Sequence, residues 1–152
     1  MSGYELWTFV HITAAIVWIG GAAVAQVFGI LAKRSGDPAQ GAAFGQSMAF
    51  IGPKVFMPAS LLVLLSGIVL TEDGNWSWSE PFIYLGIIGW AAVSFTAFAY
   101  LTRAMGRVGA RIAAEGPSPE LGAELNRLVL LARVLIFVLF AIVFVMVVKP
   151  GT

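Results

Sequence analysis

His11 is the only histidine among the 152 residues, and it lies within a long apolar run near the N-terminus. Imidazole is a strong axial ligand for haem iron, and it also acts as a proton relay or as a hydrogen-bonded structural group. An ionisable side chain inside an apolar helix indicates a functional site by default. We therefore consider three roles for His11: a haem or metal ligand, a proton relay, and a structural histidine.

Two further residues could complete a site around His11. Trp18 follows seven residues later, two helical turns deeper on the same face, where its indole could form one wall of a flat pocket. Met146 lies near the end of the last apolar run, at a depth that matches His11, so its thioether could supply a second axial ligand. Ordinary packing in lipid or in the bundle core is the alternative for Met146.

Two basic residues lie near the edges of apolar runs. Lys54 begins the second run, and Arg133 lies about five residues inside the fourth. Long basic side chains near a membrane interface usually extend their charged ends to the headgroups, and we expect this of both. Facing inward, either could pair with a haem propionate or an acidic lipid, but His11 lies near the opposite face of the membrane.

Four apolar runs carry these residues. Because 59% of the residues are apolar and 11% are charged, where soluble domains have about a quarter charged, lipid is the expected solvent. Each run comes close to or exceeds the roughly 20 residues that cross the hydrocarbon core. The sequence predicts an all-α fold, a single transmembrane domain of four helices over about residues 6–32, 55–71, 82–102 and 128–148. A short interfacial helix is expected before the second span.

The positions of lysine and arginine predict the orientation. The connections between spans 1 and 2 and between spans 3 and 4 are basic, and the connection between spans 2 and 3 has no lysine or arginine. The basic residues in question are Lys33, Arg34, Lys54, Arg103, Arg107, Arg111 and Arg127. We therefore expect both termini on the extracytoplasmic side of a cell membrane, the bacterial inner membrane in particular. With a net charge of +1 and no basic patch, nucleic-acid binding is excluded.

Small residues recur at helical spacing in two of the predicted spans. Gly21, Ala25 and Gly29 form a series in the first, and Gly89 and Ala92 belong to a small face in the third. Such series allow helices to approach closely in lipid, within one bundle or between protomers. The expected partners are the lipid bilayer and other copies of the chain or a larger membrane complex.

The string His11-x6-Trp18-x-Gly20-Gly21 and the tail Met146 to Pro150 resemble the copper-resistance D (CopD)-like superfamily of small integral membrane proteins. Within it, a four-helix family ends in a similar Met-Val-Val-Lys-Pro tail. The first-helix histidine and tryptophan are also similar to those of the J-type protoporphyrinogen oxidase (HemJ), whose matching histidine is implicated in binding haem b. The oxidase pattern has a tyrosine and a Pro-Arg pair where this chain has Ala22 to Phe28, so the resemblance does not carry that activity over.

Three functions are compatible with this sequence. The resemblance implies a b-type haem-binding, redox-associated membrane protein with His11 as ligand. A non-catalytic accessory or structural subunit of a membrane complex is the alternative, and copper handling or transport is the second alternative. The sequence offers few ligands for copper transport, because it has five methionines, one histidine and no cysteine. Catalysis is not expected, because no paired intramembrane carboxylates or Ser/His/Asp set is present.

Overall fold

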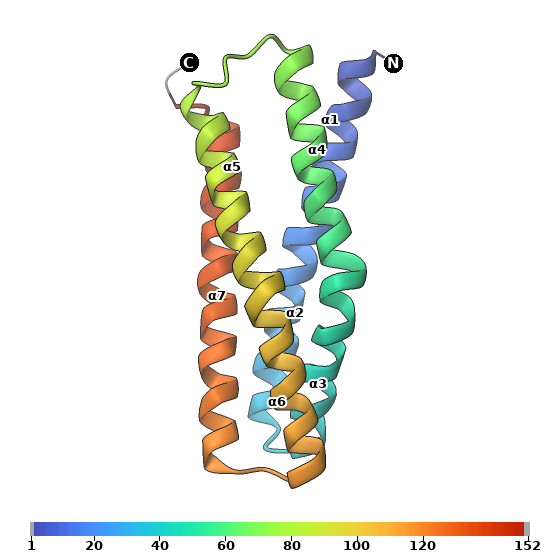
Figure 1. The fold of residues 1–152 in the computed structure, drawn as a ribbon, viewed down its shortest axis with the longest axis vertical. Coiled ribbons are helices and arrows are strands. Elements are labelled where there is room, and N and C mark those ends of the chain that lie inside the picture. Colours follow the sequence, from blue (N-terminus) through green and yellow to red (C-terminus); the bar gives the residue numbers. More distant parts are fainter. Residues whose placement is uncertain (1, 151–152) are drawn as a thin grey trace.

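The computed structural model describes residues 2–150 as a bundle of four long helical stretches joined by short connections (Figure 1). Each stretch is long and apolar enough to cross a membrane, which confirms the predicted all-α four-helix architecture. The stretches are Gly3–Arg34, Pro38–Asp73, Pro81–Glu115 and Pro119–Val148. They contain 30 to 36 residues, which at about 1.5 Å per residue exceeds the roughly 30 Å of a hydrocarbon core.

A π-helical turn interrupts each of the first three stretches. The first comprises α1 (Gly3–Ala15), η1 (Ile16–Gly20) and α2 (Gly21–Arg34). The second comprises α3 (Pro38–Ile51), η2 (Gly52–Phe56) and α4 (Met57–Asp73). The third comprises α5 (Pro81–Ser94), η3 (Phe95–Leu101) and α6 (Thr102–Glu115), and the fourth is α7 (Pro119–Val148). The short helix expected before the second span is α3, and it continues through η2 into α4.

Local sequence signals explain where the helices begin and end. Ser2 and Glu5 form a capping box at the start of α1, with Ser2 N donating to Glu5 Oε2 over 2.8 Å. Ser118 caps α7 by accepting from Leu121 N over 3.2 Å, and Pro119 occupies the first helical position. At the other end of α7, Lys149 adopts a left-handed conformation with φ of 46° and terminates the helix.

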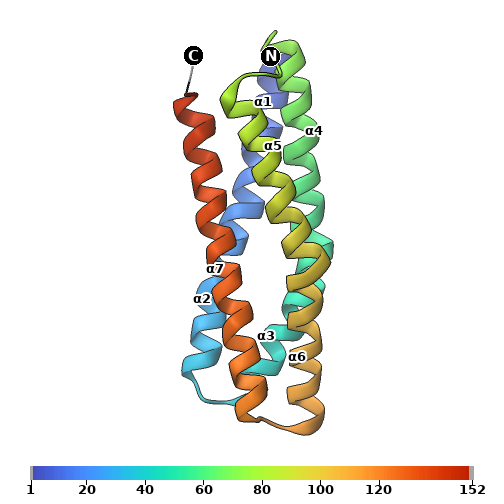
Figure 2. The same cartoon turned by 60° about the vertical axis from the view of Figure 1, so that its left-hand side comes forward.

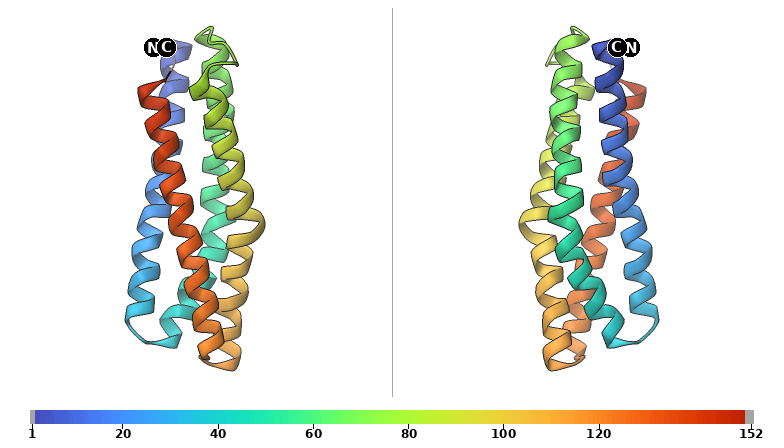
Figure 3. Two further views of the ribbon diagram at one scale, coloured as in Figure 1. Left: turned by 90° about the vertical axis from the view of Figure 1, so that its left-hand side faces the viewer. Right: turned by 90° about the vertical axis from the view of Figure 1, so that its right-hand side faces the viewer.

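The two ends of the bundle differ in packing. We call the end with the turns at residues 35–37 and 116–118 the inner end, and the end with residue 2, residue 150 and the loop at residues 74–80 the outer end (Figure 3). At the inner end α3 lies beside α6 (Figures 1 and 2). The amphipathic α6 buries Ala104, Met105, Val108 and Ile112 there, and its Arg103, Arg107 and Arg111 are exposed.

The glycines of the predicted small-residue series pack within the bundle, whereas Ala92 is exposed. A Cβ atom on Gly21 would lie 2.6 Å from Phe56 Cε1, and one on Gly29 would lie 2.9 Å from Phe44 Cζ, so helix 1 packs against aromatic rings of the second stretch. On α5, a Cβ at Gly89 would meet Ile142 of α7 at 2.6 Å. These glycines therefore serve helix packing inside one chain.

At the outer end the four helices separate into two pairs. α1 packs on α4, and α5 packs on α7. Figure 1 shows the two pairs apart near the outer end, with the loop at residues 74–80 running across from α4 to α5. Below this level, Trp18, Ala59, Val93 and Leu139 form a buried cluster near the middle of the bundle. The candidate site lies between the pairs, above this cluster.

Candidate functional site

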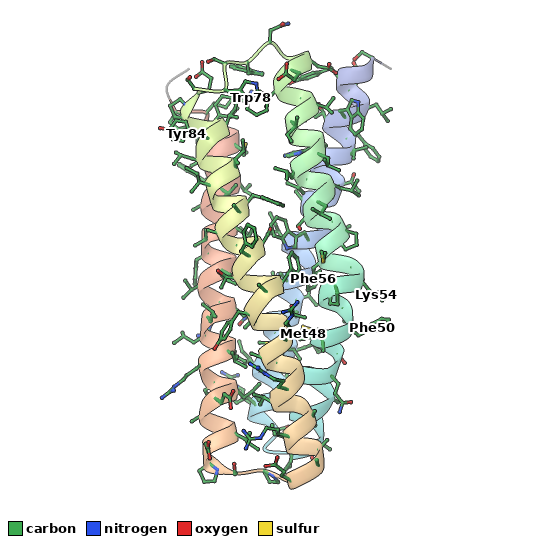
Figure 4. All side chains as sticks on the ribbon, in the orientation of Figure 1. Met48, Phe50, Lys54, Phe56, Trp78 and Tyr84 are labelled. Atoms are coloured by element: carbon green, nitrogen blue, oxygen red, sulfur yellow. The ribbon has the colours of Figure 1, made fainter. Side chains whose placement is uncertain are left out.

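A cavity of about 740 Å³ lies between the two helix pairs. Its walls come from α1, η1, α4, α5 and α7, and the loop at residues 74–80 contributes Trp76 and Trp78. Figure 4 shows Trp78 at the outer end, between α4 and α5. We call this space the outer cavity. Most of its lining is apolar or aromatic, which is typical of sites that hold a cofactor or another small apolar molecule.

His11 lines the outer cavity from α1 and is fixed by a residue of α4. His11 Nδ1 lies 3.0 Å from Ser66 Oγ, and Ser66 is fully buried. The Ser66 hydroxyl donates to the backbone carbonyl of Leu62 and lies 3.2 Å from that of Val63. A hydroxyl has a single proton, so toward His11 the Ser66 oxygen acts as the acceptor. This arrangement is compatible with a proton on His11 Nδ1, which the Ser66 oxygen would accept.

Gly67 provides the space for the imidazole. A Cβ atom at this position would lie 3.3 Å from His11 Cε1 and 3.7 Å from Nδ1. Gly67 also lines the outer cavity. The ring of His11 therefore lies against two consecutive residues of α4, the Ser66 hydroxyl and the backbone of Gly67.

The other predicted ligand residues have different locations. Met146 lines the outer cavity from α7, and a Cβ on Gly86 of α5 would be 2.0 Å from its Cε, so Gly86 makes room for this side chain. Trp18 does not line the outer cavity, contrary to the expectation that it forms a wall of the pocket around His11. It is packed in the central cluster, where 4% of its surface is exposed. Trp90 of α5 is the indole that lines the outer cavity, and its Nε1 donates to the Ser60 carbonyl over 2.9 Å.

Lys54 and Arg133 lie away from the outer cavity. Both side chains are exposed, and Figure 4 shows Lys54 pointing away from the bundle. Within residues 2–150, neither side chain makes a hydrogen bond or an ion pair. Neither lines the outer cavity, so the propionate role considered for them has no structural support.

A basic residue that sequence reasoning left aside lies at the outer cavity. Lys149 lines it, with Nζ 4.5 Å from the centroid of the Trp76 ring and 5.5 Å from that of Phe82. The two rings pack edge to face at 5.2 Å. The signal in the sequence was that Lys149 is the one basic residue beyond the outer end of a span, directly after Met146-Val147-Val148.

Comparison with known proteins agrees with the four membrane-length helices. The model of the DUF2269 family, described as predicted integral membrane protein, matches residues 5–150. The chain belongs to the DUF2269 family. The family places this multi-pass protein in a lipid bilayer, and it adds nothing on the CopD-like or oxidase relationship. No curated protein and no solved structure matched the chain.

This DUF2269 protein also has a smaller cavity of about 90 Å³ toward the inner end. Trp18 and Gln26 line it, together with Phe44, Met48 and Phe56. Gln26 Nε2 donates to the Val129 carbonyl over 3.2 Å, and Gln26 Oε1 is buried without a hydrogen-bond partner within residues 2–150. Among the same residues there is no group of three His, Cys, Asp or Glu side chains that could hold a metal ion.

Proposed function

We propose that this DUF2269 protein binds b-type haem in the outer cavity, with His11 Nε2 as an axial ligand. The observation that carries the proposal is the hydrogen bond between His11 Nδ1 and Ser66 Oγ. With the proton on Nδ1, the lone pair of the imidazole lies on Nε2. Histidines that bind metals commonly donate their second ring nitrogen to a fixed acceptor, which sets the tautomer and the ring orientation.

The dimensions and lining of the outer cavity support a flat apolar cofactor. Its volume of about 740 Å³ falls within the usual range for ligand sites. Trp90 and Phe140 offer aromatic surface from different helices. When bound, haem supplies one-electron chemistry, and the protein supplies orientation and a dry environment. His11 would hold the iron, and the aromatic side chains would exclude water.

Met146 is the candidate for a second axial ligand. Its thioether lines the same cavity as His11 and comes from α7, in the opposite helix pair. A His/Met pair raises the reduction potential of haem relative to ligation by histidine alone. A redox-associated role in the membrane follows from this pair.

The test is a Soret spectrum and a pyridine haemochrome assay on detergent-purified protein expressed with a supply of haem. We expect a Soret band in the wild type, its loss in His11→Ala, and a retained but shifted band in Met146→Leu. Met57→Leu is the matched control, because Met57 lies on α4 and does not line the cavity.

A wild-type protein without a Soret band, or a His11→Ala spectrum identical to the wild type, contradicts the proposal. The accessory-subunit function would then take its place. That function has no site of its own among the described residues, so its support would come from purification of a stable complex rather than from the cavity.

A further inference from the structure

Two arginines of α6 have no partner of opposite charge among the described residues. Arg103 and Arg107 are exposed, and within residues 2–150 neither makes a hydrogen bond or an ion pair. The third arginine of this helix, Arg111, bonds Glu115 over 3.3 Å and lies 4.0 Å from Glu124 of α7. The charges of Arg103 and Arg107 are therefore available to a ligand from outside the chain.

The same two arginines lie on one outward face of α6. A spacing of four residues places two side chains one above the other, with about 5–6 Å between their Cβ atoms. Ala104 and Met105, which lie between them in the sequence, are buried. No acidic residue occurs between Pro81 and Ala114, nor in α3, which packs on α6. An anion can therefore approach both guanidinium groups without meeting a carboxylate of these helices.

Their position along the third stretch places the two arginines at the depth of lipid phosphates. At about 1.5 Å per residue, Arg103 lies roughly 33 Å from Pro81 along the helix, close to the roughly 30 Å of a hydrocarbon core. Arg107 follows about one turn farther, and Arg111 about one turn beyond that. The two arginines without a partner are thus those at headgroup depth, and the paired arginine lies beyond them.

The surface that precedes the arginines, on the side of the outer end, is apolar. Phe95 and Tyr100 of η3 are exposed. Aromatic side chains at this level contact acyl chains, and tyrosine is typical of the boundary between the hydrocarbon and the headgroups. A phosphate with acyl chains attached can therefore bind through its charge and its tails, whereas a free phosphate can bind through its charge alone.

We propose that Arg103 and Arg107 bind the headgroup of an anionic phospholipid, with both guanidinium groups on its phosphate and its acyl chains along η3. Arginine suits this role, because its planar fork donates two parallel hydrogen bonds to a phosphate. The lipid would fix the depth of α6 in the membrane. This site is independent of the proposed haem site, which lies at the outer end of the bundle.

The experiment compares two lipids with the same acyl chains and different headgroup charge. Purified protein in a neutral detergent is titrated with dioleoylphosphatidylglycerol, which is anionic, and with dioleoylphosphatidylcholine, which is zwitterionic. Native mass spectrometry gives the dissociation constant of the first bound lipid. Arg103→Gln and Arg107→Gln each remove one charge of the site. Arg111→Gln is the matched control, because it removes the same charge about one turn farther along the same helix.

We expect the wild type to bind the anionic lipid roughly ten- to thirtyfold more tightly, since each arginine near an anionic lipid surface contributes about fivefold. Arg103→Gln and Arg107→Gln should each lower this ratio about fivefold, whereas Arg111→Gln should leave it within about twofold. Arg103→Lys and Arg107→Lys should give intermediate ratios, because lysine keeps the charge and lacks the fork. Equal affinities of all variants for the zwitterionic lipid would show that each variant is folded.

A wild-type ratio near one overturns the site. An equal fall in all three glutamine variants also overturns it, because the attraction would then come from the charge of the inner end as a whole. Inorganic phosphate in excess distinguishes the two sources of the phosphate group. If it lowers the ratio no more than sodium chloride at the same ionic strength, the ligand is the lipid. If it abolishes the ratio at that ionic strength, the lipid is overturned as the ligand, and the two arginines bind a free anion.

Discussion

Ser66 and His11 come from different helices, and their contact joins two polar side chains within a largely apolar wall. A buried hydroxyl without a partner is costly, so Ser66 must direct its proton somewhere. It bonds to the carbonyl one turn earlier in its own helix, at Leu62. At the scale of the residue, this leaves the Ser66 oxygen as an acceptor. The proposed haem site uses this acceptor to hold the proton on His11 Nδ1, which leaves the lone pair on Nε2.

The Ser66→Ala variant tests this arrangement. Without the acceptor, His11 can take either tautomer and can rotate, so we expect haem affinity to fall by roughly ten- to a hundredfold, as for the loss of other outer-shell partners of metal ligands. The measurement is a Soret titration. Ser60→Ala is the matched control, because Ser60 is also a buried serine of α4 whose hydroxyl bonds to its own helix, over 3.0 Å to the Met57 carbonyl.

Both alanine variants lose a bond from a hydroxyl to the backbone, and Ser66→Ala alone also loses the contact with His11. An equal loss of haem affinity in Ser60→Ala and Ser66→Ala would mean that Ser66 acts through general packing rather than through His11. A Ser66→Ala protein with unchanged affinity would contradict the inferred tautomer.

At the scale of the element, α3 and α6 approach each other closely in the inner half. A Cβ atom on Gly45 would lie 2.7 Å from the Met105 carbonyl oxygen and 2.9 Å from Gly109 Cα. Both of these are backbone atoms, which cannot move aside as the end of a side chain can. The two helices therefore meet backbone to backbone at this point.

Gly45→Ala should consequently destabilise the protein by about 1–3 kcal/mol, the range for overpacking. The measurement is reversible unfolding in mixed detergent micelles. Gly122→Ala is the control, because nothing lies within 4 Å of a Cβ there and the helix gains about 0.5–1 kcal/mol from the better helix former. Equal stability of the two variants would show that α3 and α6 can separate without cost.

The elements were largely predictable from the sequence, and the exceptions have physical causes. Long apolar runs identified the four helices, and Ser118-Pro119 is a helix-start signal that the sequence carries at the beginning of α7. The second helical stretch begins well before the predicted span 55–71. The glycines of α3 lower its helix propensity, so the sequence did not indicate one continuous helix, and the same glycines permit the contact with α6. Pro53 lacks a backbone N–H, and it lies in the wide turn η2 that keeps this stretch continuous.

The candidate site was predictable in part. The sequence identified His11 as the candidate ligand because it contains no other histidine. The seven-residue spacing placed Trp18 on the same face, on the assumption of a regular α-helix. Trp18 lies in the π turn η1, which has more residues per turn than an α-helix. Trp18 is therefore rotated away from the helix face that carries His11. No sequence pattern marks such a turn. Trp90 and Lys149 reach the outer cavity from distant parts of the chain, which a single sequence cannot bring together.

At the scale of the whole molecule, the surface that residues 2–150 form does not indicate a particular protein partner. Exposed side chains such as Phe137 and Phe144 suit lipid tails and a neighbouring protein helix equally, because both are apolar. Assembly into a homo-oligomer or a larger complex therefore stays a prediction. The distribution of charge between the two ends is more informative.

The inner end is the basic end, since Lys33, Arg34 and the exposed arginines of α6 gather there. The outer end carries Glu72 and Asp73 at the end of α4 and Glu80 in the loop. Arg111 also bonds Glu115 over 3.3 Å and approaches Glu124 of α7 at 4.0 Å, so part of this charge is paired across the inner turn. By the positive-inside rule we expect the inner end to face the cytoplasm. The outer cavity and its mouth at Lys149 would then be reached from the extracytoplasmic side.

Single cysteines can test this orientation, because the native chain contains no cysteine and every label reports the introduced thiol. Ser79→Cys places a thiol in the exposed outer loop, and Ala114→Cys places one at the exposed end of α6. With a membrane-impermeant maleimide on intact spheroplasts, we expect Ser79→Cys to be labelled at once and Ala114→Cys only after permeabilisation. The reverse pattern would place the mouth of the outer cavity in the cytoplasm, so that the ligand would have to enter from there.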